Sequence, residues 1–142
     1  MTVKKIKIYK NKVIKNKKGN IIKFVSTKNT FFKKFGEVYF NEINYKKKKG
    51  WIKHKKNQCI FAVAYGEINF KLVDDRKFSK SYGNEENIKL NKSKHSILIL
   101  PPGIWFSFTT NKKKSILINL VNSVHSDKEI LKSKKIKNYH IK

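Results

Sequence analysis

The stretch that decides the fold reads CIFAVAYGEINFKLV and spans residues 59–73. It contains two runs rich in Ile, Val and Phe, Cys59–Ala64 and Glu67–Val73, which are separated by Tyr65 and Gly66. In the second run apolar and polar side chains alternate, which is the period of a strand with one covered face and one exposed face. The stretch therefore predicts two consecutive strands joined by a tight turn.

Similar short apolar segments continue on both sides of this stretch and are separated by turn residues. On the N-terminal side, Ile6 and Ile8 alternate with lysines, and a turn at Lys18-Gly19-Asn20 precedes a strand that begins at Ile21. No long helical pattern competes with these segments. Their spacing is typical of an all-β sandwich or barrel, and about eight strands suffice for a jelly roll. The other predicted strands are Gly36–Asn44, Gly50–Lys55, Ile88–Leu90, Ile97–Leu100, Trp105–Thr109 and Ile116–Val121.

Two segments in the C-terminal half carry further expectations. Ile97–Leu100 is apolar on both faces, so it should lie centrally or be covered by a second sheet or subunit, and a homodimer would supply such a cover. After Val121 the chain turns polar, and the pattern favours a short C-terminal helix from Asp127 to Lys132. The Lys-rich tail, about residues 133–142, is expected to be mobile.

Length and composition limit the class of protein. A chain of 142 residues suits one domain, which we place at residues 1–142 with a barrel core at about 17–124. No apolar run is long enough for a signal peptide or a membrane span, so we expect a cytoplasmic protein. Cys59 is the single cysteine, which excludes an intramolecular disulfide and a cysteine-based metal site.

The formal net charge of +26 would ordinarily suggest a polyanionic partner. Arg76, however, is the single arginine among 35 basic residues, although arginine makes the bidentate contacts to phosphates and bases. The lysines are spread along the whole chain beside many Asn and Ile residues, which is typical of coding bias. Nucleic acid is therefore not the expected partner, and a nucleic-acid-binding barrel ranks third among the candidate functions.

Four motifs follow one another between Lys49 and Phe108, namely KGWIKH at 49–54, YGE at 65–67, DDRKFSKSYG at 74–83 and LPPGIWFSF at 100–108. Together they resemble the dTDP-4-dehydrorhamnose 3,5-epimerases. That family consists of sugar-nucleotide cupins with a basic-Gly-x-His strand, a glycine turn, a D-x-R-x-x-S-x-T-F-G segment and an I-P-P-G-F-A-H-G-F segment in this order. The resemblance covers about residues 17–129 and implies a cupin jelly-roll β-barrel.

The resemblance also implies a chemistry. In the family a histidine removes protons next to the ketone of a 4-keto-6-deoxy sugar on a nucleoside diphosphate, and a tyrosine returns them from the other face. By alignment His54 takes the role of the base, and imidazole titrates near neutral pH as that role requires. The two extra residues between Gly50 and His54 preserve the facing of the side chain along a strand.

Several positions depart from the family pattern. Phe106 stands where the family has a second histidine, and Ser123 or Val124 stands where its catalytic tyrosine follows the last barrel strand. Cys59 and Ala62 replace a lysine and an arginine of the family. These changes remove the family's general acid and some of the side chains with which the family binds its substrate.

Other residues could replace what is missing. Lys49, Lys53 and Lys56 lie around His54 and could supply cations, Tyr39 or Tyr65 could supply a phenol, and Asn119 could bind a sugar. Trp51 and Trp105 could stack on a sugar or base, although aromatic side chains more often fill cores. Arg76 could contact substrate or form a salt bridge with Asp74 or Asp75. His125 is the second candidate histidine. The candidate substrate-binding residues are Lys49, Lys56, Arg76, Asn119, Trp51 and Trp105.

These features favour an epimerase or related isomerase of a 4-keto-deoxy-sugar nucleotide that serves surface polysaccharide biosynthesis. The competing function is a non-catalytic cupin that binds a sugar nucleotide or a partner after losing the acid. We expect no cofactor. We also expect no metal, because a metal cupin needs a His-x-His pair where this chain has Ile52-Lys53-His54.

Overall fold

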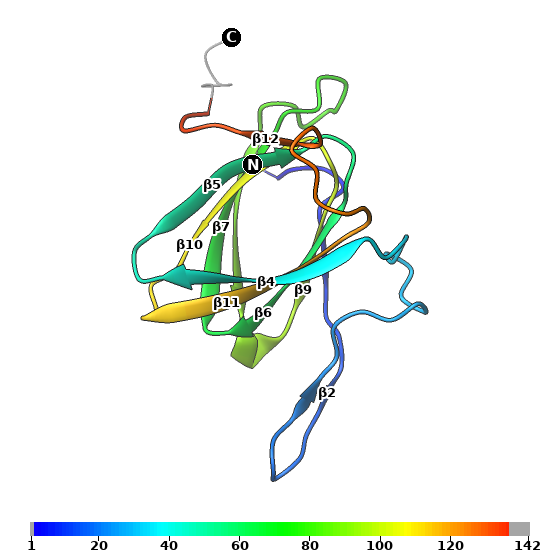
Figure 1. The fold of residues 1–142 in the computed structure, drawn as a ribbon, viewed down its shortest axis with the longest axis vertical. Coiled ribbons are helices and arrows are strands. Elements are labelled where there is room, and N and C mark those ends of the chain that lie inside the picture. The colour runs from blue at the N-terminus through cyan, green and yellow to red at the C-terminus, as the bar shows by residue number, and fades with distance from the viewer. Residues whose placement is uncertain (1, 137–142) are drawn as a thin grey trace.

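The computed structural model describes residues 2–136, and strands make up nearly all of the regular structure there (Figure 1). β-branched and aromatic residues dominate these strands because such side chains fit a pleated, half-buried surface. The described residues also contain one short 3-10 helix, Lys92–Lys94. The strands are β1 (Lys7–Tyr9), β2 (Val13–Ile14), β3 (Ile21–Ile22), β4 (Glu37–Asn44), β5 (Lys48–His54), β6 (Cys59–Tyr65), β7 (Glu67–Asp74), β8 (Glu85–Asn91), β9 (Ile97–Leu100), β10 (Ile104–Thr109), β11 (Lys114–Val121) and β12 (Ile130–Lys132).

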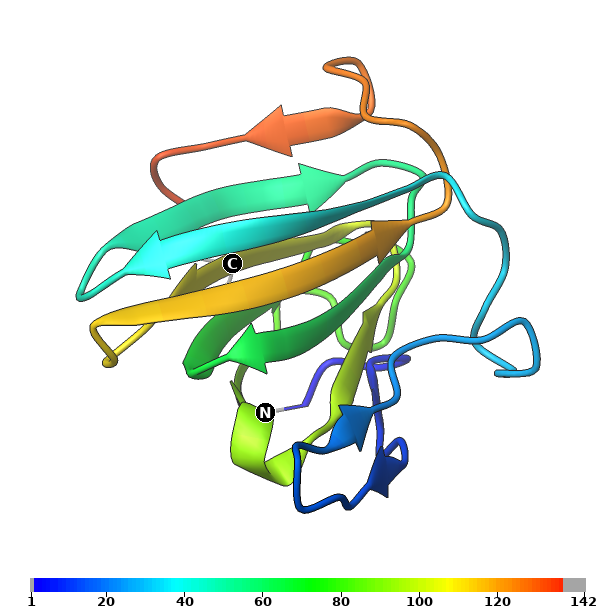
Figure 2. The same cartoon turned by 60° about the horizontal axis from the view of Figure 1, so that its bottom comes forward.

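Two five-stranded sheets face each other (Figures 1 and 2). The first sheet has the order β1-β9-β6-β11-β4 and the second has the order β12-β5-β10-β7-β8. Their strand pairs are antiparallel, and a separate hairpin of β2 and β3 projects away from them (Figure 1). This arrangement confirms the predicted all-β jelly-roll architecture.

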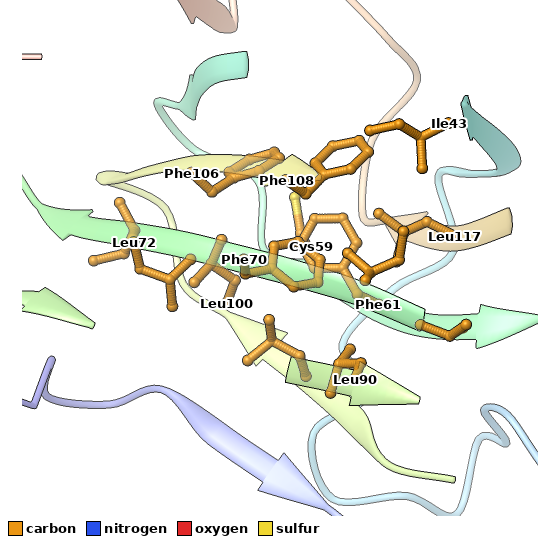
Figure 3. Packing of buried hydrophobic residues seen from close by; sticks show 14 of the residues in the cluster. Ile43, Cys59, Phe61, Phe70, Leu72, Leu90, Leu100, Phe106, Phe108 and Leu117 are labelled. Carbon is orange, nitrogen blue, oxygen red and sulfur yellow. The ribbon is translucent and has the colours of Figure 1, made fainter. Parts of the chain in front are cut away.

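The core lies between the two sheets and is built from the inward-facing residue of each alternating pair. In β7, Ile68, Phe70 and Leu72 are buried, as the alternation predicts. The ring of Phe61 from the first sheet lies 5.1 Å from that of Phe70 and 5.3 Å from that of Phe106, both from the second sheet (Figure 3). Interdigitated aromatic rings therefore hold the sheets together.

The cover of the outer face of β9 comes from the same chain. Leu98 and Leu100 face the core, whereas Ile97 and Ile99 belong to a second buried cluster against which Phe24 and other residues of the segment 24–32 pack. The apolar pattern of Ile97–Leu100 is thus explained without a second subunit. Homodimer formation stays a prediction.

The predicted helix from Asp127 to Lys132 is wrong. Residues 127–129 form a turn, and Ile130–Lys132 is strand β12, which pairs antiparallel with β5. Six residues are too few for a stable isolated helix, whereas the open edge of β5 offers hydrogen-bond partners. Ser133 extends the pairing through two backbone hydrogen bonds of 3.1 Å with Trp51.

The sheets reach beyond the predicted core at about 17–124, since β1 joins one of them and β12 joins the other. Of the tail predicted to be mobile, residues 137–142 lie outside the described residues. Within the described part of the chain, no helix is long and apolar enough to cross a membrane.

Candidate functional site

A pocket of about 320 Å³ opens between β4 of the first sheet and β5 and β12 of the second. Strand alternation explains its lining, because every second residue of β4 and β5 points between the sheets. The lining combines three phenylalanine rings with polar side chains. Its residues are Glu37, Tyr39, Asn41, Ile52, His54, Phe61, Phe106, Phe108, Asn119, His125, Ile130 and Lys132.

His54 is the most constrained polar residue of the pocket. It is 5% exposed, and its Nδ1 lies 2.5 Å from Oε1 of Glu129. An ionised carboxylate can only accept hydrogen bonds, so the hydrogen of a neutral His54 resides on Nδ1. The Nε2 atom is then the basic nitrogen, and it has no hydrogen-bond partner within residues 2–136.

The pairing of β12 with β5 places Glu129 beside His54. Ile130 is opposite His54 in that pairing, and the backbone N–H of Lys55 donates to the carbonyl of Glu129 at 2.9 Å. Oε2 of Glu129 also accepts from the backbone N–H groups of Lys55, at 2.7 Å, and Lys56, at 3.2 Å. Both carboxylate oxygens are therefore held, and the imidazole is fixed in orientation.

The charge state of Glu129 follows from these contacts. Burial is the largest single influence and by itself raises the pKa, but the hydrogen bonds from His54 and from the Lys56 and Lys55 backbone outweigh it. The pKa of Glu129 therefore lies below its ordinary value. At neutral pH the residue is a carboxylate that can stabilise a positive charge on His54.

A second polar group lies on the first sheet, across the pocket from His54. Tyr39 of β4 and Asn119 of β11 are directly opposite in the strand pairing, and Nδ2 of Asn119 donates to the Tyr39 hydroxyl at 2.8 Å. Nδ2 also lies 3.7 Å from Sγ of Cys59, a thiol whose pKa burial raises to about 12. Oδ1 of Asn119 is buried without a hydrogen-bond partner among the described residues, and so it is available to a ligand donor.

Basic groups lie at the edge of the pocket. Lys132 of β12 lines it, and Nζ of Lys49 donates to Oδ1 of the lining residue Asn41 at 2.5 Å. His125, the second candidate histidine, also lines it, and its backbone N–H donates to Oε1 of Glu37 at 3.0 Å. Positive charge is thus available beside a largely apolar interior.

Five of the six predicted substrate-binding residues, Lys49 among them, lie outside this lining. Arg76 forms the predicted salt bridge with Asp74 at 2.9 Å, and its contact with substrate stays a prediction. The Trp105 indole donates to Asp75 at 3.0 Å, Trp51 lies beneath the ammonium of Lys48, and the Lys56 side chain is exposed. Lys49 touches the lining, and His54 and Asn119 form part of it.

Sequence reasoning missed Glu129, Glu37, Asn41 and Lys132. The signal for Glu37 and Asn41 was their period of two with Tyr39. Glu129 lies in the segment predicted to be a helix. Acidic residues are rare in this chain, which has nine, and this rarity was the signal that could have drawn attention to Glu129. Within residues 2–136 no three His, Cys, Asp or Glu side chains gather in a way that could hold a metal ion.

Two facing antiparallel sheets with a pocket between them define a barrel of the cupin type. The family model for dTDP-4-dehydrorhamnose 3,5-epimerase matches residues 1–136, and the chain belongs to that family. No curated protein sequence matches it significantly.

Solved structures show the same fold at low sequence identity. A dTDP sugar isomerase from Desulfovibrio desulfuricans G20 is 23% identical, with a TM-score of 0.91 over 96% of this chain and 88% of that chain. A dTDP-6-deoxy-D-glucose-3,5-epimerase from Legionella pneumophila Philadelphia 1, solved with dTDP-4-keto-L-rhamnose, is 14% identical, with a TM-score of 0.86 over 98% and 78%. A sugar 3,4-ketoisomerase from Thermoanaerobacterium thermosaccharolyticum, solved with TDP, is 17% identical, with a TM-score of 0.78 over 94% and 91%.

Proposed function

We propose that this protein moves a proton at a carbon next to the ketone of a 4-keto-deoxy-sugar nucleotide, as a 3,5-epimerase or a related isomerase. The observation that carries the proposal is the His54–Glu129 pair. Glu129 holds Nδ1 of His54, which leaves Nε2 free, and His54 lines the pocket. Membership of the epimerase family supports the substrate class.

The chemistry of the pocket suits a general base. Nε2 of His54 takes the proton from the carbon, and the electron pair of the broken C–H bond forms an enolate with the neighbouring ketone. Glu129 stabilises the imidazolium that results. The stacked ring of Phe106, with its centroid 6.2 Å from that of His54, helps to exclude water, so these charge interactions are stronger than in bulk solvent.

The basic edge of the pocket supports a diphosphate site. Lys132 and Lys49 are long, flexible cations that can follow a diphosphate lying across the rim, although each offers a point charge and not a planar fork. The sugar would then enter between the sheets while the nucleotide remained outside. We place the reaction in surface polysaccharide biosynthesis, where deoxy sugars are activated as nucleotides.

The test is solvent deuterium incorporation. Incubation with several 4-keto-deoxy-sugar nucleotides in deuterated water should label the carbon next to the ketone, as detected by NMR. His54→Asn should slow the labelling by about 10²- to 10⁴-fold, the range for loss of a general base. Absence of label from all substrates with the wild-type protein would contradict the proposal.

A non-catalytic sugar-nucleotide-binding protein is the second candidate. The observation that favours it is the apolar Phe106 in the pocket, where the resemblance places a second histidine. Calorimetric binding of a sugar nucleotide with equal affinity by wild type and His54→Ala, without any deuterium exchange, would support this function over the first.

A further inference from the structure

We infer that Tyr39 is the acid that returns the proton to the sugar carbon, on the face opposite His54, and that Asn119 is a positioning residue for its hydroxyl. The inference rests on the proposed function and adds the missing partner of the base. It assigns this role to a tyrosine of β4, far in sequence from the position after the last barrel strand.

The placement of the two side chains suits inversion. Tyr39 projects from β4 of the first sheet and His54 from β5 of the second, and both line one pocket. A flat enolate held between the sheets would therefore present one face to the imidazole and the other to the phenol. Epimerisation requires a base and an acid on opposite faces of the same carbon.

The hydrogen bond from Asn119 determines what the phenol can offer. Nδ2 of Asn119 donates to the Tyr39 oxygen at 2.8 Å, so that oxygen is the acceptor in this contact. The hydroxyl hydrogen of Tyr39 has no acceptor among the described residues and is free for a ligand. The same amide stabilises the phenolate that remains after the proton has left.

Burial keeps the acid protonated until it is needed. It is the largest cause of the raised pKa of Tyr39, followed by the nearby Cys59, while the Asn119 hydrogen bond acts in the opposite direction. The phenol therefore enters the reaction in its neutral, proton-donating form. Glu37, Asn41 and His125 also line this part of the pocket.

The other candidates for the acid are less suited. The Ser123 hydroxyl donates to Oδ1 of Asn57 at 2.7 Å, and Val124 carries no proton to give. Tyr65 is 58% exposed and lies outside the pocket lining. His125 lines the pocket, but its ring lies 3.2 Å from Asp127 in an exposed pair.

The proton transfers balance without a co-reactant. The C–H bond breaks as Nε2 of His54 gains the proton, and a new C–H bond forms on the other face as the O–H bond of Tyr39 breaks. The phenolate then takes a proton from water, and the imidazolium returns one to water. The sugar is neither oxidised nor reduced, and the new hydrogen originates from solvent.

The experiment separates exchange from inversion for the full chain in deuterated water. Tyr39→Phe should still label the carbon with retained configuration, because His54 can return a deuteron on its own face. Its rate of inversion should fall by about 10²-fold or more. Asn119→Asp has nearly the same shape, but its carboxylate accepts the phenol hydrogen, so it should lose inversion and keep exchange. Tyr65→Phe is the matched control and should behave as wild type.

Each outcome decides a separate point. Neither exchange nor inversion in the wild-type protein would refute the proposed function itself. Inversion by Tyr39→Phe at the wild-type rate, or its loss in His125→Gln alone, would overturn the role of Tyr39 and leave the proposed function standing. Undiminished inversion in Asn119→Asp would overturn the positioning role. A merely structural effect of either substitution would reduce exchange and inversion together.

Discussion

At the scale of single residues, Glu129 decides what His54 can do. An imidazole alone can carry its hydrogen on either nitrogen, whereas the carboxylate beside Nδ1 selects the form whose other nitrogen is basic. The same carboxylate holds the backbone of Lys55 and Lys56, so it couples the geometry of the site to its charge.

We expect Glu129→Gln to reduce the exchange rate by at least about tenfold with little change in KM, because the imidazolium loses its counter-charge while the pocket keeps its shape. NMR assays of exchange over a range of substrate concentrations would check this. A larger effect on KM than on the rate would contradict it.

The same substitution should change the dependence of stability on pH. The folded-state pKa of Glu129 is lowered, so its contribution to the free energy of unfolding is present above the unfolded value of about 4.3 and is lost as pH falls through the folded value. The free energy of unfolding, measured with urea between pH 7 and pH 3, should therefore fall more steeply with decreasing pH in the wild type than in Glu129→Gln. Equal slopes would show that the ion pair contributes nothing to acid sensitivity.

At the scale of elements, the turn between β6 and β7 depends on Gly66. Its φ is +81°, and an added Cβ would lie 2.2 Å from Oγ of Ser115. That oxygen accepts a hydrogen bond from the backbone N–H of Glu67 and is also hydrogen-bonded to the hydroxyl of Thr110. This glycine is required both for its backbone conformation and for the close approach of β11.

We expect Gly66→Ala to destabilise the protein by about 1–2 kcal/mol through the backbone and by about 1–3 kcal/mol more through the clash. Gly19→Ala is the control, since Gly19 also has positive φ, +135°, but nothing within 4 Å of the added atom. Urea unfolding gives both free energies. Equal losses in the two variants would show that Ser115 moves aside without cost.

At the scale of the whole molecule, the charge of +26 works against the compact state. Nine acidic residues cannot neutralise 35 basic ones, and four of the nine already pair with basic side chains in the described part of the chain: Asp75 with Lys53, Asp74 with Arg76, Glu67 with Lys89 and Glu42 with Lys114. Most lysines therefore repel one another across the surface.

We expect the melting temperature to rise between about 0.01 M and about 0.3 M NaCl, as the screening length falls from about 30 Å to below about 10 Å. Thermal unfolding followed by circular dichroism would measure it. KCl at equal ionic strength should give the same rise, whereas a flat or falling response would show that repulsion is not a major cost.

The sequence by itself determined the strands with clear alternation, the order of the four motifs and the candidacy of His54. Local patterns suffice there. The period of two in β7 indicates which side chains face inward, and a run such as Ile97–Leu100 indicates that both faces of the strand are covered. The family resemblance rested on the same motifs.

Only the tertiary structure decided which residues meet His54. Glu129 reaches it because β12 pairs with the edge of β5, and Tyr39 meets Asn119 because β4 pairs with β11, although 80 residues separate them along the chain. It likewise decided that the segment 24–32 covers β9 and that residues 130–132 form a strand. Such contacts depend on the register of strands remote in sequence, and no local pattern encodes that register.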